Sequence, residues 1–350
     1  PDNEFNIAKF RAIKQLILSQ GPEGLKPETE RAKPWEREAQ ISSPEGRKEY
    51  WLNVTEHAQA VAQVADVLAK LVKLPEGQHQ QLVLAAWAHE TGKREEILGT
   101  KQGKYPKRKT AEERTHQFLA DQYGSEIAHI IRGTSVGVME EYHRGELSGN
   151  NELLTRLLFF ADEVVDGSKV TSWQERIAAW TDEDLKTKPV EAYGGQTQAQ
   201  IESKFAVEVE TQIRELAKLP SEIDLVPLLR TAIKAPRVLK PSENEPWVPV
   251  TSQPDVSKLV FLDSEDLNDM RKAKMVNTAR LHPGQTLSPH EHINLSEIFV
   301  IIGGRGVITI KDMTWEITPG DMAVAWPYQL HSITNVSSDE LTICTVGFAV

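Results

Sequence analysis

Two separate sets of histidine and acidic residues in this 350-residue chain have the composition of metal sites. In the C-terminal part, His290 and His292 are two positions apart, and Glu297 follows five positions later. On a β-strand, residues two apart face the same side, so both imidazoles would point to one place, which Glu297 can reach after a turn. His331 offers a third imidazole from another strand. Three imidazoles and one carboxylate suit a divalent transition metal with positions left open for water or substrate.

The second set lies in the N-terminal part and consists of His57, His89, Glu90 and Asp162. Each of these residues is on, or at the end of, an apolar run with helical spacing. Taken singly, each has an ordinary explanation as a core histidine or a solvated carboxylate. A buried imidazole or carboxylate without a partner is costly, however, so several of them in one helical core should meet each other or a metal.

Helices are expected to position the second set. A helix beginning after Thr55 places His57 on its apolar face, and residues 82–89 are apolar almost all round, which is typical of a helix buried on every side. Further amphipathic helices are expected at 111–123, 126–132, 153–165 and 200–219. No strand is expected before residue 245, so we predict an all-α domain.

Short β-prone runs separated by Gly and Pro turns are expected to position the first set. Pro319-Gly320 supplies one turn, and Lys311-Asp312 is a predicted hairpin tip. Seven or more strands in about 100 residues predict a sandwich or a barrel. The expected strands are 258–261, 276–281, 298–302, 307–310, 314–317, 323–325 and 341–346.

The predicted domain organisation follows from the change from helical spacing of apolar residues to short β-prone runs. Residues 1–235 form the predicted helical domain, and residues 255–350 the predicted β domain. The stretch 236–254 between them contains five prolines, which neither a helix nor a central strand tolerates, so it is expected to be a linker or an extended strap.

Composition excludes several classes of protein. The net charge of −11 argues against a general nucleic-acid binder, because phosphate backbones are held by clustered positive charge. The single cysteine, Cys344, excludes an internal disulfide and a four-cysteine zinc site. No apolar run approaches the ~18 residues of a membrane span, and no secretory signal opens the chain, so a cytoplasmic location is expected.

The C-terminal pattern resembles the cupin family. The first cupin motif is matched at every position by Gly284, His290, His292, Glu297 and Gly304, and the second is kept at Gly320, His331 and Asn335. Trp326 and Tyr328 replace the proline and the second glycine of that second motif. The resemblance implies a jelly-roll barrel that carries iron, manganese, zinc or nickel on His290, His292, Glu297 and His331. Many cupins pair through strands, so it also implies a homodimer as one arrangement.

The N-terminal pattern resembles the HD-domain superfamily of metal-dependent phosphohydrolases, over a motif core of residues 50–170. The resemblance implies manganese, iron, magnesium or nickel on His57, His89, Glu90 and Asp162. It also implies catalytic roles for Glu90 and Lys93, with Lys93 and the basic stretch 101–109 neutralising phosphate charge. That stretch is equally explained as a solvated, mobile loop. Glu90 stands where the family has Asp, so a metal-free relic is the alternative.

Additional ligands for a second metal are not evident in the N-terminal pattern. His116 and His129 are the candidates, and each is equally explained as a structural histidine, so a mononuclear site is expected.

Three functions remain open from the sequence. The first is a metal-dependent phosphohydrolase that acts on a small phosphorylated molecule, with the cupin domain binding a ligand or substrate. The second makes the cupin the enzyme, an iron-dependent oxygenase or an isomerase, with the helical domain as scaffold. The third is a non-catalytic sensor in which both sites only bind. In all three the expected partners are small molecules, with no nucleic acid and no membrane.

Overall fold

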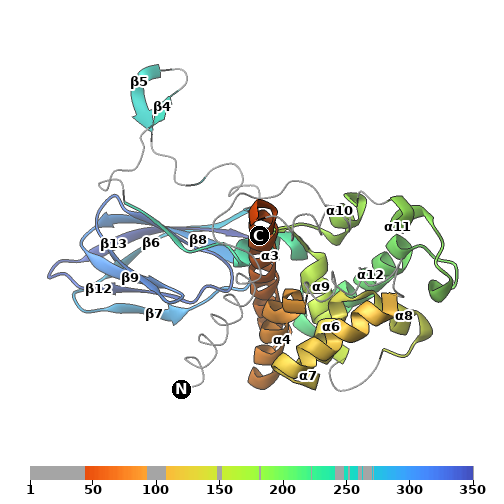
Figure 1. Cartoon of the computed structure of the whole chain (residues 1–350). Helices are drawn as coiled ribbons and strands as arrows, with labels where there is room; N and C mark the ends of the chain where they lie inside the picture. Colours follow the sequence, from red (N-terminus) through yellow and green to blue (C-terminus); the bar gives the residue numbers. More distant parts are fainter. Residues whose placement is uncertain are drawn as a thin grey trace. The chain divides into compact units, whose positions relative to one another are not determined.

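The computed structural model describes residues 44–92, 108–147, 152–180, 183–221, 223–240, 248–250, 253–258, 262, 270 and 272–349 (Figure 1). The chain divides into two compact units, residues 1–220 and 221–350. The second unit therefore begins before the expected linker at 236–254. Whether the chain separates into folded domains within 236–254 stays a prediction.

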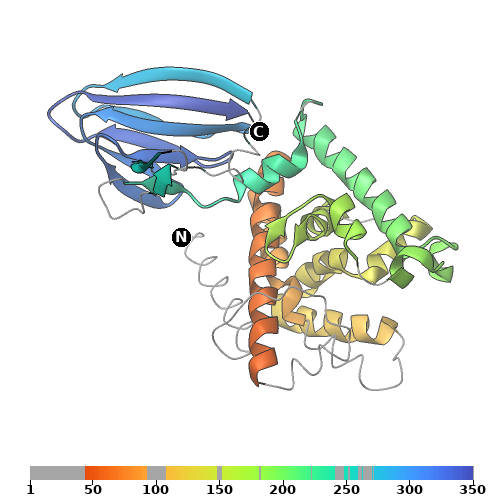
Figure 2. The ribbon, with the colours of Figure 1, turned by 90° about the horizontal axis from the view of Figure 1, so that it is seen from above.

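The first unit is helical, as predicted. Helix α3 is the longest of the described helices and packs against α4 and α9 (Figure 2). Residues 93–107 lie outside the described residues, and with them Lys93 and most of the basic stretch 101–109. The α-helices are α3 (Pro44–Leu71), α4 (Glu76–Ala88), α6 (Arg108–Tyr123), α7 (Ser125–Ile131), α8 (Val136–Arg144), α9 (Glu152–Glu163), α10 (Trp173–Ala178), α11 (Glu183–Thr187) and α12 (Gln198–Ala217). Short 3-10 helices are η1 (His89–Gly92), η2 (Arg132–Thr134) and η3 (Glu191–Tyr193).

The expectation that no strand precedes residue 245 is wrong. A small hairpin joins β1 (Val165–Asp166) to β2 (Lys169–Val170), directly after α9. Gly167 at its tip has φ of 59°, a left-handed conformation that glycine adopts without steric cost, so two residues suffice for the turn. In the second unit β3 (Arg237–Leu239) also precedes residue 245.

The second unit begins with α13 (Leu225–Ala232) and continues as antiparallel strands. A four-stranded sheet of order β10-β9-β12-β7 faces a five-stranded sheet of order β3-β11-β8-β13-β6 (Figure 1). Strands β4 (Val248–Val250) and β5 (Gln253–Lys258) form a separate pair. The remaining strands are β6 (Lys272–Leu281), β7 (Thr286–His290), β8 (Leu295–Gly303), β9 (Gly306–Ile310), β10 (Met313–Ile317), β11 (Met322–Ala325), β12 (His331–Asn335) and β13 (Leu341–Ala349).

Along β8, β9, β12 and β13, buried residues alternate with partly buried ones. The buried side chains fill the space between the two sheets. The core includes Phe299, Ile301, Ile308, Ile310, Ile333 and Ile343. The two predicted turns are present: Lys311 has φ of 56° at the β9–β10 tip, and Gly320 has a positive φ. The short-strand pattern therefore predicted this β architecture correctly.

Candidate metal centres

The four residues predicted in the β half meet at one end of the barrel. One ligand atom from each of His290, His292, Glu297 and His331 lies within 4.8 Å of the other three. Glu297 Oε2 is 2.9 Å from His292 Nε2 and 3.1 Å from His331 Nε2. The rings of His290 and His331 lie 4.4 Å apart between centroids. These residues therefore form a compact group with the composition of a transition-metal site.

Strand pairing explains this convergence. His290, the last residue of β7, is directly opposite His331, the first residue of β12. Glu297 lies on β8, on the inward-facing side with Phe299. The expectation that His290 and His292 share a strand is wrong, because β7 ends at His290 and His292 lies in the connection to β8.

Exposure differs across the group. Glu297 and His331 are buried, at 4% and 2%, whereas His290 and His292 are partly exposed. The group is thus held from inside the barrel and reachable from the side of the two histidines.

Hydrogen bonds show that these residues fit a cation. His331 Nδ1 lies 2.8 Å from the carbonyl of Gln329, which only accepts, so Nδ1 carries the proton. In a neutral ring Nε2 then has only a lone pair, yet it faces the Glu297 carboxylate. Two acceptors at that distance need a proton or a metal ion between them. His290 Nδ1 likewise lies 2.9 Å from the carbonyl of Ser288, which leaves its Nε2 free for a metal.

The charge of Glu297 is consistent with a ligand. Burial raises the pKa of this carboxyl, but hydrogen bonding to His331 and the nearby His292 outweigh burial, and the pKa lies below its usual value. Glu297 is therefore ionised at neutral pH, as a metal ligand must be.

Tyr328 occupies the position of the second glycine in the second cupin motif, in a left-handed conformation with φ of 59°. That backbone conformation is the one glycine favours, so the side chain changes while the turn is kept. The Tyr328 N–H donates to the carbonyl of His292 at 2.8 Å. The departure from the motif therefore leaves the ligand set in place.

The four residues predicted in the helical half also come together. His57 Nε2 lies 2.9 Å from Asp162 Oδ1. His89 Nε2 lies 3.8 Å from the same oxygen and 3.7 Å from Glu90 Oε1. One ligand atom each of His57, His89 and Glu90 lies within 4.8 Å of the other two. The group draws on α3, η1 and α9.

Two backbone carbonyls orient the imidazoles of this helical group. His89 Nδ1 lies 2.6 Å from the carbonyl of Ala86, and His57 Nδ1 lies 2.9 Å from that of Gly167 in the β1–β2 hairpin. Both Nδ1 atoms must therefore carry protons, and both Nε2 atoms face the carboxylates. Burial lowers the pKa of His89, although Glu90 and Asp162 act in the opposite direction, so its ring is neutral at pH 7. Its Nε2 is buried and has no hydrogen-bond partner among the described residues.

Arg176 on α10 belongs to this neighbourhood and was not predicted. Its Nη1 lies 3.7 Å from Asp162 Oδ1 and donates to the carbonyl of Val165 at 2.7 Å. Burial raises the pKa of Asp162, but Arg176 and then His57 outweigh it and hold the pKa well below its usual value. A capping box between Ser172 and Glu175 fixes the start of α10. That box is a sequence signal near Arg176, but it marks a helix start rather than a site.

The remaining predicted residues lie elsewhere or outside the described part. His116 is on α6 and His129 on α7, and neither belongs to the metal-competent groups among the described residues. Burial, Arg132 and His129 lower the pKa of His116. Lys93, predicted to be catalytic, lies outside the described residues.

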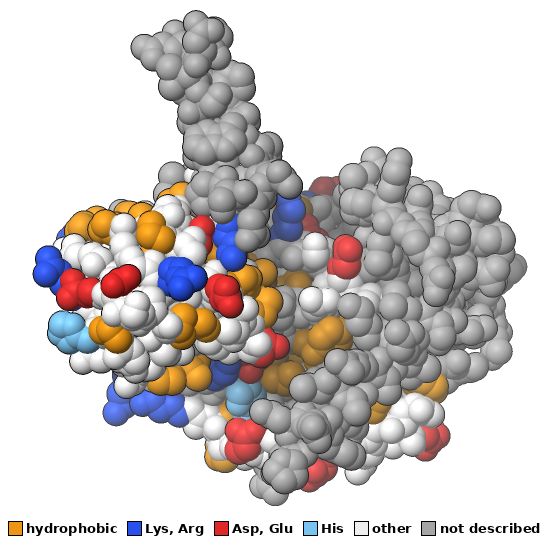
Figure 3. All heavy atoms as spheres, turned by 90° about the vertical axis from the view of Figure 1, so that its left-hand side faces the viewer, with side chains coloured by type: hydrophobic (Ala, Val, Ile, Leu, Met, Phe, Trp, Pro, Cys, Tyr) orange, Lys and Arg blue, Asp and Glu red, His pale blue; other side chains and the backbone are white. Residues whose placement is uncertain are grey.

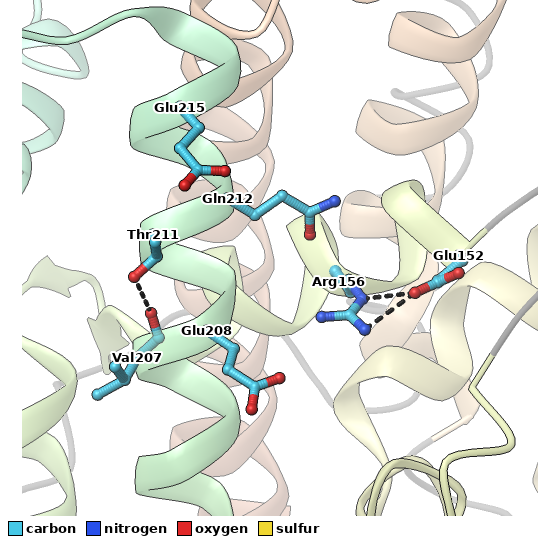
Figure 4. A pocket seen from close by; sticks show the side chains of 7 residues that line it. All are labelled: Glu152, Arg156, Val207, Glu208, Thr211, Gln212 and Glu215. Carbon is cyan, nitrogen blue, oxygen red and sulfur yellow. Dashed lines mark hydrogen bonds and ion pairs between the residues drawn. The ribbon is translucent and has the colours of Figure 1, made fainter.

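A groove of about 320 Å³ between α9 and α12 is distinct from both groups (Figure 4). Three of its charged residues are engaged locally: Arg156 donates to Glu152, and Tyr142 donates to Glu208. No histidine or cysteine is among the residues that line it. Its lining residues are Glu152, Arg156, Val207, Glu208, Thr211, Gln212 and Glu215.

The surface carries both charge signs. On the described part of one face, basic, acidic and apolar side chains are interspersed rather than gathered by sign (Figure 3). None of the described helices is long and apolar enough to cross a membrane.

Comparison with known proteins supports the assignment of the β half. The model of the cupin domain family matches residues 277–347, which span the barrel ligands. No curated protein matches the chain. The family match and the ligand geometry together define the C-terminal part as a cupin domain with a group that could hold a metal. The HD-type assignment of the helical half stays a prediction.

The solved structures that the chain resembles are similar to it at low sequence identity. The chain is similar to a predicted oxalate decarboxylase from Thermotoga maritima, with 24% identity over 27% of this chain and 80% of that one and a TM-score of 0.22. It is also similar to a cupin protein from Bacteroides fragilis, with 25% identity over 21% of this chain and 64% of that one and a TM-score of 0.21. An uncharacterized protein with a double-stranded β-helix domain from Klebsiella pneumoniae is 24% identical over 21% of this chain and 65% of that one, with a TM-score of 0.21.

Proposed function

We propose that the protein is a metal-dependent hydrolase of the HD type, acting on a small phosphorylated molecule at the helical group. The observation that supports this most is His89 Nε2, a buried lone pair with no hydrogen-bond partner among the described residues. It faces Glu90 and Asp162, beside His57. Burying a nitrogen without a hydrogen-bond partner costs free energy in a purely structural cluster. A metal ligand, in contrast, requires an unprotonated nitrogen of this kind.

Each residue of the helical group has a role in this proposal. A bound divalent ion would supply an acidified water and an anchor for a phosphate oxygen. His57, His89, Glu90 and Asp162 hold the ion, with the two rings fixed by Gly167 and Ala86. Arg176 keeps Asp162 ionised. Lys93 follows the group in sequence, and its proposed role is to neutralise phosphate charge.

A comparison of full-length variants tests this proposal. Phosphoester hydrolysis with added Mn²⁺ should be lost in His89→Ala and kept in His292→Ala, because only the first change touches the helical group. Glu90→Asp is the more discriminating variant: in a working site it moves the carboxylate by about a bond length and weakens metal binding. Activity that is lost in His292→Ala but kept in His89→Ala would assign the chemistry to the barrel.

The cupin barrel is proposed to bind a small ligand or the substrate through its metal. A second candidate function makes the barrel the enzyme, an iron-dependent oxygenase or an isomerase. The observation that favours it is the complete barrel group, with four ligands and two of them partly exposed toward solvent. Oxygen consumption by the iron-loaded protein that is lost in Glu297→Gln would support this second candidate.

A further inference from the structure

Gln329 lies in the connection between β11 and β12 and is fully buried, at 0% exposure. Both ends of its side chain are hydrogen-bonded. Its Oε1 accepts from the backbone N–H of Trp326 at 3.2 Å, and its Nε2 donates to the backbone carbonyl of Lys234 at 2.6 Å. The side chain therefore ties the segment that enters the barrel to the connection that leads to His331.

The same connection contacts two residues of the barrel group. The carbonyl of Gln329 accepts from His331 Nδ1 at 2.8 Å, and the N–H of Tyr328 donates to the carbonyl of His292 at 2.8 Å. A displacement of this connection would consequently rotate one imidazole and shift the backbone of another.

The entering segment has further contacts besides the Gln329 hydrogen bond, including a strand pairing. We call residues 234–239 the entry strap. Its strand β3 pairs with β11, with Val238 opposite Ala323, and Leu239 is 1% exposed in a cluster with Trp326. The Lys234 ammonium also lies 4.6 Å from the centroid of the Trp326 ring, where the ring face attracts a cation. The entry strap is thus a fixed support against which Gln329 can hold the connection.

We propose that Gln329 is a positioning residue for the metal ligand His331, and that it transmits the position of the entry strap to the barrel metal site. This inference rests on the proposal that the barrel group binds a metal. Outer partners that orient a metal-bound histidine typically contribute about 10–100-fold to metal affinity. The backbone carbonyl of Gln329 makes the contact with His331, and the two hydrogen bonds of the side-chain amide fix the position of that carbonyl.

Cobalt affinity of the full-length chain tests this, in a His57→Ala/His89→Ala background that removes the helical group. Gln329→Met keeps the length of the side chain and removes both hydrogen bonds. The matched control is Gln285→Met, because Gln285 Oε1 also accepts from an N–H three residues earlier, that of His282 at 2.8 Å. Chelator competition should show affinity for Co²⁺ about 10–100-fold weaker in Gln329→Met, and within about threefold of the parent in Gln285→Met.

A metal-free readout separates positioning from general loosening. Nitrogen-15 NMR of the His331 ring should show a fully protonated Nδ1 in the parent and in Gln285→Met, and a partly deprotonated Nδ1 in Gln329→Met, where the Gln329 carbonyl no longer holds that proton. If circular dichroism shows that Gln329→Met does not fold, Gln329→Asn should show the same direction, because it is too short to reach Lys234.

Two negative outcomes are distinguishable. Equal cobalt affinity in Gln329→Met and Gln285→Met would overturn the positioning role while leaving the metal site standing. A parent that binds no cobalt would overturn the barrel metal site, and the role of Gln329 with it.

Discussion

Oδ1 of Asp162 lies 2.9 Å from Nε2 of His57, although the two residues are 105 positions apart in the sequence. Asp162 lies in the last turn of α9 and His57 lies within α3. These two helices pack against each other. His57 bonds the hairpin carbonyl of Gly167 through its other nitrogen. A neutral ring cannot donate to both acceptors, so a second proton or a metal ion is required at this contact.

Asp162→Asn should remove metal from the helical group. An amide is a weaker ligand than a carboxylate and leaves the two rings without a negative partner, so Mn²⁺ affinity should fall by more than the roughly 10–100-fold typical of outer partners. Titration of the full-length chain by calorimetry measures this. Asp166→Asn is the control, an exposed aspartate on the adjoining β1, and should bind as the parent does. Equal affinities in the two variants would remove Asp162 from the site.

Arg176→Gln should destabilise the metal-free protein by about 3 kcal/mol, because it leaves the largely buried Asp162 carboxylate without its cationic partner. Urea unfolding followed by helical circular dichroism measures the loss. Arg214→Gln is the control, since its pair with Glu210 on α12 is more exposed and contributes about 0.5 kcal/mol.

The stabilisation by Arg176 has a defined pH dependence. The folded pKa of Asp162 is lowered below its ordinary value of 3.8, so the contribution is complete above that pH and is lost as pH falls through the folded pKa. The difference between Arg176→Gln and the parent should therefore be constant from pH 5 to 7. A difference that grows toward acid would contradict this sign.

Gly304→Ala should destabilise the barrel more than Gly284→Ala does. Both glycines have positive φ, so both substitutions carry about 1 kcal/mol of backbone strain. A Cβ at Gly304 would also lie 2.4 Å from the carbonyl oxygen of Glu340, whereas one at Gly284 meets nothing within 4 Å. We expect a total loss of about 2–4 kcal/mol for Gly304→Ala. Urea unfolding of both variants checks this, and equal losses would show that the β8–β9 turn relaxes freely.

Limited proteolysis tests the predicted linker. Proline density in residues 236–254 predicts that cleavage there separates a helical fragment from a β-rich one. Circular dichroism of the purified fragments should show one helical and one β spectrum. Mixed spectra in both fragments would place the boundary elsewhere.

Local pattern was sufficient to predict the helical unit and the antiparallel strands, and the eight residues that it singled out come together in two groups. That these groups hold metal ions stays a prediction. The predictions for His290, His292 and Glu297 depended on a complete motif, and that for Asp162 on a carboxylate at the end of an apolar run. The β1–β2 hairpin was missed because two-residue strands have no detectable period, yet its Gly167 orients His57. Arg176 was missed because its role comes from the packing of α10 near α9, which residue spacing does not encode.

The central proposal is that one chain binds two metal ions, one in the barrel group and one in the helical group. Metal content per full-length chain after reconstitution with Mn²⁺ or Fe²⁺ tests it most directly. We predict two ions in the parent, one in His290→Ala/His292→Ala, one in His89→Ala/Asp162→Asn, and none when all four changes are combined. An unchanged metal content in His290→Ala/His292→Ala would contradict the barrel site, and an unchanged content in His89→Ala/Asp162→Asn would contradict the helical one.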